Sequence, residues 1–279
     1  MFWFCSAVSA ETTPEDFGRR LFERTPVVTY ASDEAWFRAC CTAGGEPLES
    51  WSETRDALRR VVAAAGRELA VQGDVRSRGA ALARWLHTEV FRRYDLDASS
   101  PGRTLADGRY NCVSASILYR YVARTLELDA VGYCRDEHCR IALRQNGNWW
   151  ILETTCASCV GESAVTARIA SDALGRDRLV DAAGMEALVW FNQAVDFARA
   201  GRVEAALKGN ATALALDPRH GGAKSNLTAN LNAAAIDALA RRDATSAMAW
   251  LLLAERFNPP DETTRHNLDY LRRHAGASN

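Results

Sequence analysis

The sequence carries almost no net charge. It has 34 lysine and arginine residues against 35 aspartate and glutamate residues, which gives a formal net charge of −1. Proteins that bind nucleic acids or anionic membranes through charge show a basic excess or a basic patch. The overall balance in this chain therefore gives no electrostatic reason to expect a nucleic-acid partner.

The chain also lacks a long apolar run. A membrane-spanning helix needs about 20 consecutive apolar residues, and no segment of the sequence approaches that length. The first ten residues, MFWFCSAVSA, are apolar and end in small residues, as the tail of a secretory signal does, but they have no basic start. A truncated signal peptide and a merely apolar N-terminus both remain open, so the localisation is undecided between exported or periplasmic and cytoplasmic.

What the chain does have is a globular composition. Apolar residues make up 48% of its 279 residues, which is enough for a real core and for one large domain or two ordinary ones. Periodicity and capping signals predict helices and strands in the first part and helices only in the last part. We expect an α+β fold, with an N-terminal extension over 1–30, a mixed domain over 31–180 and an all-helical domain over 185–279.

The mixed part is expected to begin with helices and to end with a small sheet. Residues 92–109 are expected to form a polar loop, and 164–181 a polar loop or short helix. A pair of strands about the dipeptide Asn146-Gly147, a strong hairpin signal, is expected near the middle of the chain. The predicted helices cover 15–24, 33–41, 52–71, 74–91 and 111–126, and the predicted strands 130–133, 139–144 and 149–154.

Three reactive side chains stand at the ends of these predicted elements. Cys112 opens the helix 111–126, where the helix dipole and the free N–H groups would favour a thiolate. His138 precedes one strand of the hairpin, and the register about Asn146-Gly147 places it close to Glu153, at the end of the other strand. A thiol, an imidazole and a carboxylate are the parts of a nucleophile, its base and the group that orients the base.

Beyond Gly184 the chain becomes rich in alanine and repeats itself loosely. The segment ending at Pro218 and the segment ending at Pro259 match the positions of small and aromatic residues in the tetratricopeptide pattern. We expect two helical pairs and a capping helix over 261–273. The positions that match are Trp190, Ala194, Phe197, Ala206 and Ala213 in the first copy and Ala235, Ala238, Ala247 and Ala254 in the second.

The block Asn111-Cys112-Val113-Ser114-Ala115-Ser116, followed by His138 and by Trp150-Ile151-Leu152-Glu153-Thr154-Thr155, resembles the transglutaminase-like superfamily. The resemblance covers roughly 50–160 and implies a papain-like core. Its implied site consists of Cys112 as nucleophile, His138 as base and Glu153 as third member. The family usually has aspartate at the third position, and the interval of 26 residues between Cys112 and His138 is short for its peptide-crosslinking members. A helical tail of the tetratricopeptide kind accompanies this core in a bacterial subgroup.

Two functions follow as hypotheses. The first is a cysteine protease, amidase or transamidase that acts on a peptide or protein substrate at a peptide or glutamine amide carbonyl. The alternative is a catalytically inactive scaffold that binds a protein partner in the groove of its helical repeats. Trp149, Trp150 and Tyr110 are candidates for substrate contact, and at least one of the two tryptophans is expected to be buried.

No cofactor is expected for this chemistry. A structural zinc ion is a less favoured alternative, because four cysteines lie on or beside the predicted strands with spacings near those of zinc ligands. A disulfide between two of the four is equally open if the protein is exported. The four residues are Cys134, Cys139, Cys156 and Cys159.

Overall fold

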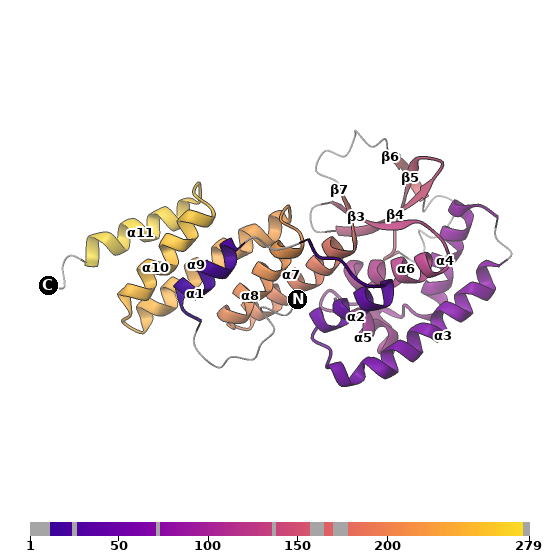
Figure 1. The fold of residues 1–279 in the computed structure, drawn as a ribbon, viewed down its shortest axis with the longest axis horizontal. Helices are drawn as coiled ribbons and strands as arrows, with labels where there is room; N and C mark the ends of the chain where they lie inside the picture. Colours follow the sequence, from indigo (N-terminus) through magenta and orange to yellow (C-terminus); the bar gives the residue numbers. More distant parts are fainter. Residues whose placement is uncertain are drawn as a thin grey trace. The chain divides into compact units, whose positions relative to one another are not determined.

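The structure is a computed structural model that describes residues 12–23, 27–70, 73–135, 138–156, 165–169 and 178–275. The apolar start of the chain and Cys159 therefore lie outside the described residues. The fold mixes helices and strands, in agreement with the expected α+β class (Figure 1). It divides into two compact units. We call Val28–Asn192 the core unit, and Met1–Val27 together with Gln193–Asn279 the helical unit.

Within the described residues, the core unit holds helices α2 to α6, the first part of α7 (Ala182–Arg199), a short 3-10 turn and two sheets. One sheet is a two-stranded parallel pair and the other has five strands in the order β6-β5-β4-β3-β7, with antiparallel neighbours throughout. Besides α7, the helical elements are α2 (Asp33–Ala43), η1 (Leu48–Ser50), α3 (Trp51–Leu69), α4 (Val75–Glu89), α5 (Pro101–Asp107) and α6 (Cys112–Thr125). The strands are β1 (Arg93–Tyr94), β2 (Arg109–Tyr110), β3 (Ala130–Arg135), β4 (His138–Gln145), β5 (Asn148–Leu152), β6 (Val165–Ile169) and β7 (Arg178–Val180).

Helix α6 forms the centre of the core unit. Every residue from Cys112 to Ala123 is buried, and a helix that is buried all round is one that other elements enclose. It packs against β3 and β4 (Figure 1) and also contacts helices α2 to α5. The sheet turns Ile141, Leu143 and Leu152 into the same core cluster, so the helix that begins at Cys112 lies directly against the strands that carry the other candidate residues.

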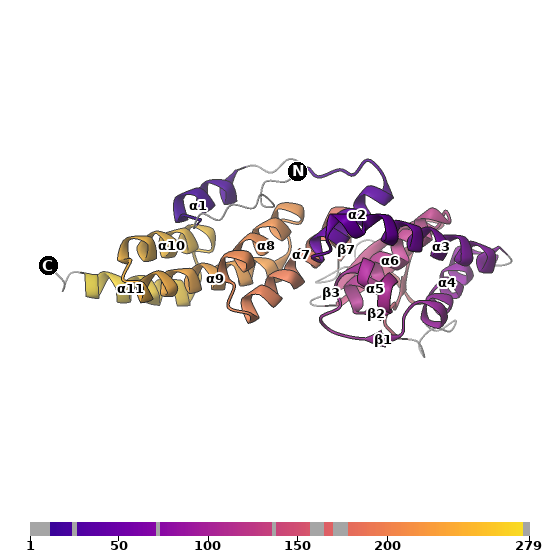
Figure 2. The ribbon, with the colours of Figure 1, turned by 90° about the horizontal axis from the view of Figure 1, so that it is seen from below.

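Two expectations about loops are wrong. The segment 92–109 contains β1, α5 and β2, which lie together (Figure 2). Helix α5 has the usual start and stop signals of a helix. Ser100 is its N-cap, Pro101 lies in its first turn, and Gly108 ends it in the left-handed region (φ 77°). The segment 164–181 contains strands β6 and β7 rather than a loop or helix. β6 (VTARI) and β7 (RLV) are only five and three residues long, which is too short for the alternation that identifies a longer strand.

The helical unit takes up the last part of the chain. Its helices are α1 (Pro14–Phe22), the second part of α7 (Ala182–Arg199), α8 (Val203–Leu216), α9 (Gly221–Ala240), α10 (Ala244–Phe257) and α11 (Glu262–Ala275). Consecutive helices pack in the order α8, α9, α10, α11. The alanines singled out by their spacing are all buried, which lets neighbouring helices approach closely: Ala206, Ala213, Ala235, Ala238, Ala247 and Ala254.

The boundaries of the units differ from those expected. The division falls inside α7, after Asn192, because Met185 and Val189 on the first turns of α7 belong to the apolar cluster of the core unit. Helix α1 is not a separate extension, since Phe17 is 1% exposed and lies in the cluster formed by α8 to α11. The sequence around α1 shows an amphipathic helix but does not indicate which surface its apolar face covers.

Candidate active site

Cys112 is the first residue of α6, and the residue before it fixes that start. The Asn111 carbonyl Oδ1 accepts hydrogen bonds from the backbone N–H groups of Val113 (2.9 Å) and Ser114 (3.1 Å). The side-chain amide of Asn111 in turn donates to Ser99 Oγ (2.8 Å). The backbone N–H of Asn111 donates to Ser114 Oγ (3.0 Å), which completes a capping box. The thiol therefore sits at the positive end of a helix whose first turn is held on both sides.

The hairpin expected from Asn146-Gly147 is present and brings His138 to Glu153. Asn146 (φ 51°) and Gly147 (φ 77°) both adopt the left-handed region that a two-residue hairpin turn requires. Strand β4 begins at His138, β5 ends one residue before Glu153, and the His138 Nε2 atom lies 2.8 Å from Glu153 Oε2. The predicted proximity of these two side chains is thus confirmed.

The second carboxylate oxygen of Glu153 is held as well. Glu153 Oε1 accepts hydrogen bonds from the Thr155 N–H (3.0 Å) and hydroxyl (2.6 Å), and Arg140 Nε lies 3.8 Å from Oε2. Burial alone would raise the pKa of Glu153, but the hydrogen bonds from His138 and Thr155 outweigh it and lower that pKa to about 2. The carboxylate is therefore ionised and fixed in direction at any ordinary pH.

His138 interacts with Cys112 as well as with Glu153. A hydrogen bond with the Cys112 sulfur, together with the one to Glu153, raises the pKa of His138 to about 9. The structure thus brings together Cys112, His138 and Glu153, in that order of contact.

A buried hydroxyl one turn along α6 ties this helix to both strands. Ser116 Oγ lies 2.9 Å from Thr154 Oγ1 and 3.3 Å from the Cys139 carbonyl oxygen. Cys139 follows His138 and Thr154 follows Glu153, so a single side chain contacts the neighbours of both the imidazole and the carboxylate. Ser116 is fully buried and Thr154 is 1% exposed. Both residues belong to the sequence blocks that suggested the site, but neither was assigned a role.

Two aromatic side chains from the preceding elements support the end of β5. The His87 ring on α4 packs edge-on against Tyr110, and its Nε2 atom lies 3.1 Å from the Thr154 carbonyl oxygen. The Tyr110 hydroxyl donates to the Thr155 carbonyl oxygen (3.4 Å). Tyr110 is only 7% exposed, so its observed contacts are structural, and contact with a substrate remains a prediction.

Trp149 and Trp150 lie on opposite faces of β5, and both are half-buried. The expectation that at least one would be buried is therefore wrong. Trp150 packs against the main core cluster and Trp149 against a smaller one that includes Tyr133. Each ring is covered by a guanidinium group, of Arg76 over Trp150 and of Arg144 over Trp149, which explains why large aromatic groups are stable at partial exposure.

Tyr94 also lies near the site, although its sequence context shows no sign of this. Its ring is 46% exposed and packs edge-on against Tyr110 at a centroid distance of 5.7 Å. Burial and the negative charges of Cys112 and Glu153 raise the pKa of the Tyr94 hydroxyl.

The four cysteines considered for zinc do not share one state. Cys134 and Cys139 are reduced and their sulfur atoms lie 3.5 Å apart, whereas Cys156 is disulfide-bonded. Cys159, the fourth of these residues, is outside the described residues. Within the described ranges, no three His, Cys, Asp or Glu side chains are grouped as a metal site. The four-cysteine zinc site remains a prediction.

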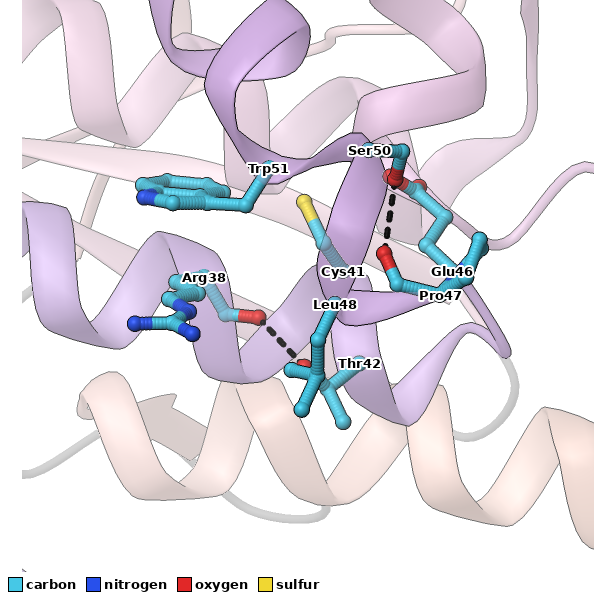
Figure 3. A pocket seen from close by; sticks show the side chains of 8 residues that line it. All are labelled: Arg38, Cys41, Thr42, Glu46, Pro47, Leu48, Ser50 and Trp51. Atoms are coloured by element: carbon cyan, nitrogen blue, oxygen red, sulfur yellow. Dashed lines mark hydrogen bonds between the residues drawn. The ribbon is translucent and has the colours of Figure 1, made fainter.

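A small pocket is present elsewhere in the core unit. It lies where α2, η1 and the start of α3 meet, and the buried Cys41 thiol forms part of its wall (Figure 3). None of the predicted site residues lines it. The lining residues are Arg38, Cys41, Thr42, Glu46, Pro47, Leu48, Ser50 and Trp51.

Within the ranges that the structure covers, no helix has the length and apolar character needed to span a membrane. Comparison with known proteins gave no match to any family model, curated protein or solved structure.

Proposed function

We propose that the chain is a transglutaminase-like cysteine hydrolase or acyltransferase that acts on peptide or glutamine amide carbonyls. The observation that carries this proposal is the position of His138, which is hydrogen-bonded to the Cys112 side chain and whose Nε2 lies 2.8 Å from Glu153 Oε2. A histidine held between a cysteine and a carboxylate is the arrangement that activates a thiol for attack on a carbonyl.

The first half of the reaction forms an acyl-enzyme. The Cys112 thiolate attacks the carbonyl carbon while His138 holds the proton, and Glu153 stabilises the imidazolium and fixes its orientation. The backbone N–H of Cys112, at the N-terminus of α6, would donate to the oxyanion of the tetrahedral intermediate. Collapse of that intermediate breaks the C–N bond, and His138 gives its proton to the leaving amine or ammonia.

The second half returns the cysteine. His138 now accepts a proton from the incoming nucleophile, which attacks the thioester carbonyl and releases the Cys112 sulfur. Water as nucleophile gives a protease or amidase, and a primary amine gives a transamidase. The half-exposed Tyr94 and the half-buried tryptophans of β5 lie around the strands that carry the site, and we assign the recognition of the substrate to this region.

Thiol reactivity tests the first step. We expect iodoacetamide at low concentration to label Cys112 of the native protein at pH 7 and to leave the buried Cys40 and Cys41 unmodified, because a histidine beside the sulfur activates it as a nucleophile. Peptide mapping identifies the labelled residue. Equal labelling of wild type and Cys112→Ala would contradict the proposal.

Turnover tests the second step. The protein is incubated with a glutamine-containing peptide library, with and without a primary amine such as hydroxylamine, and the products are followed by mass spectrometry. We expect mass changes that correspond to deamidation, cleavage or amine incorporation and that disappear in Cys112→Ala and His138→Gln. Folding of the two variants is checked by circular dichroism.

The limited exposure of Cys112 supports a second candidate. The residue is only 9% exposed, which restricts access of a carbonyl to the sulfur and would suit a scaffold that has kept the triad without turnover. In that case the helical unit binds a protein partner, and Cys112 labels no faster than an ordinary thiol. The labelling experiment therefore discriminates between the two functions.

A further inference from the structure

Two buried thiols that the proposed chemistry does not use lie side by side on β3 and β4. Cys134 and Cys139 are register partners in the antiparallel pair, with sulfur atoms 3.5 Å apart. They are 5% and 2% exposed, and both are reduced. Their distance is that of a sulfur hydrogen bond rather than of a covalent bond, which is about 2.05 Å long.

The register shows that the backbone already suits a bond between them. The Arg144 N–H donates to the Asp129 carbonyl (2.9 Å), which marks these opposite residues as a hydrogen-bonded pair. Hydrogen-bonded and non-hydrogen-bonded pairs alternate along an antiparallel ladder, so Cys134 and Cys139, an odd number of steps away, form a non-hydrogen-bonded pair. The Cα atoms of such pairs lie about 4.5 Å apart, at the near end of the range of about 4.4 to 6.8 Å that disulfides span.

We propose that Cys134 and Cys139 form a reversible cross-strand disulfide that braces the strand carrying His138. The reaction with glutathione disulfide is Cys134–SH + Cys139–SH + GSSG → Cys134–S–S–Cys139 + 2 GSH. The two protein thiols lose two electrons and two protons, which reduce the glutathione disulfide. Only rotation of the two side chains is needed, because the strands already lie at a suitable distance.

The position of the bond gives it a structural consequence. Cys139 follows His138 directly, and its carbonyl oxygen accepts the hydrogen bond from Ser116 on α6. A covalent link at Cys139 therefore holds the first residues of β4 against both β3 and α6. This inference does not depend on catalysis, since the cysteine pair excludes Cys112.

Peptide mapping tests the bond directly. Wild-type protein is equilibrated in glutathione buffers from strongly reducing to strongly oxidising, starting from both the reduced and the oxidised state. It is then quenched with N-ethylmaleimide under denaturing conditions and cleaved with trypsin. Because Arg135 separates the two cysteines, a disulfide would join the peptide 125–135 to the peptide 136–140. We expect this linked pair in the oxidising buffers and its loss on reduction.

Cys40 and Cys41 provide the internal control. They are buried and reduced like the proposed pair, but they are adjacent residues of α2 and cannot bond without strain. We expect both to remain fully alkylated in every buffer. Alkylation of Cys134 and Cys139 to the same extent as Cys40, or a link from either of them to Cys112, overturns the proposal.

Thermal unfolding tests the brace. A disulfide that closes so short a loop should raise the Tm of the oxidised protein by about 4 °C or more. For each protein, the Tm of the reduced form is subtracted from that of the oxidised form. The disulfide at Cys156 contributes equally to this shift in the wild type and in Cys134→Ser, so the amount by which the wild-type shift is larger is due to the new bond. Equal Tm shifts in wild type and Cys134→Ser would mean that the bond does not stabilise the fold. The peptide mapping uses the wild type alone and therefore does not depend on the folding of the variant.

Discussion

Ser116 Oγ lies 2.9 Å from Thr154 Oγ1, and this contact joins the helix of the candidate nucleophile to the strand end that carries the candidate acid. The Ser116 hydroxyl has one proton, which it donates to the Cys139 carbonyl (3.3 Å). Thr154 must then donate to Ser116. The two hydroxyls thus form a directed chain from β5 through α6 to β4, entirely inside the core.

Removal of the central hydroxyl should weaken both the fold and the site. We expect Ser116→Ala to lower the free energy of unfolding by about 1 to 3 kcal/mol, because it leaves the Thr154 donor and the Cys139 acceptor buried without that partner. Thr154→Val should cost less, since Ser116 keeps its bond to Cys139. Urea unfolding measures both, and the double variant should cost less than the sum of the single ones.

The matched control for this pair is Thr88→Val. Thr88 donates a comparable hydrogen bond to the Arg84 carbonyl (3.1 Å), but on an exposed face of α4. Its loss should change the stability by less than about 0.5 kcal/mol. If Ser116→Ala is as mild as Thr88→Val, the chain of hydroxyls does not hold the helix to the strands.

The stability of the core unit should pass through a maximum in mildly acidic solution. The pKa of Glu153 is lowered from 4.5 to about 2, so its contribution is complete above pH 4.5 and is lost as the pH falls towards 2. The pKa of His138 is raised from 6.5 to about 9, so its contribution is complete below pH 6.5 and is lost as the pH rises towards 9. Both contributions are complete between about pH 4.5 and 6.5.

Urea unfolding as a function of pH checks this window. Because the Cys112 sulfur is the largest cause of the raised His138 pKa, Cys112→Ala should move the alkaline loss to lower pH and leave the acid loss in place. Glu153→Gln should remove the acid loss. A profile for Cys112→Ala that superimposes on that of the wild type would argue against the contact between His138 and Cys112.

The length of the Glu153 side chain is the next testable feature. One carboxylate oxygen binds His138 and the other binds Thr155, so aspartate, one methylene shorter, cannot keep both contacts without movement of the strand end. We expect Glu153→Gln to lower the rate constant for alkylation of Cys112 at pH 7, since it removes one of the two hydrogen-bond partners that raise the pKa of His138.

Glu153→Asp should fall between wild type and Glu153→Gln, because it keeps the charge but loses part of the geometry. Iodoacetamide kinetics followed by mass spectrometry measures all three proteins. Glu49→Gln, on an exposed turn of the same unit, serves as the control for a change in net charge. A Glu153→Gln rate equal to that of Glu49→Gln would remove Glu153 from the site.

The parts of the site that depend on local structure could be predicted from the sequence. The turn at Asn146-Gly147 fixes the register of β4 and β5, and the register alone brings His138 to Glu153. The start of α6 could be predicted in the same way, because the residue before Cys112 is a strong cap. Each of these features follows from a few neighbouring residues.

The supporting contacts could not be predicted, because they join residues far apart in the chain. Ser116 and Thr154 are separated by 38 positions, and a serine inside an apolar helix shows no sign of its partner. His87 has the same character, since only the packing of α4 beside the end of β5 gives it a role. The cover of Trp150 by Arg76 on α4 is of the same kind, whereas Arg144 and Trp149 are register partners in the hairpin.

The position of α1 depends on a distant contact of the same kind and can be tested. Phe17 is 1% exposed and its ring lies 5.8 Å from that of Trp250 on α10, so we expect Phe17→Ala to destabilise the helical unit by about 3 to 5 kcal/mol, the usual cost of removing a buried phenylalanine. Phe22, on the same helix but 40% exposed, provides the control, and Phe22→Ala should cost less than about 1 kcal/mol. Hydrogen exchange of peptides from α8 to α11 measures the effect within this unit. The helical repeat pattern of the last 95 residues does not include α1. An unchanged exchange rate in Phe17→Ala would therefore mean that α8 to α11 are stable without α1.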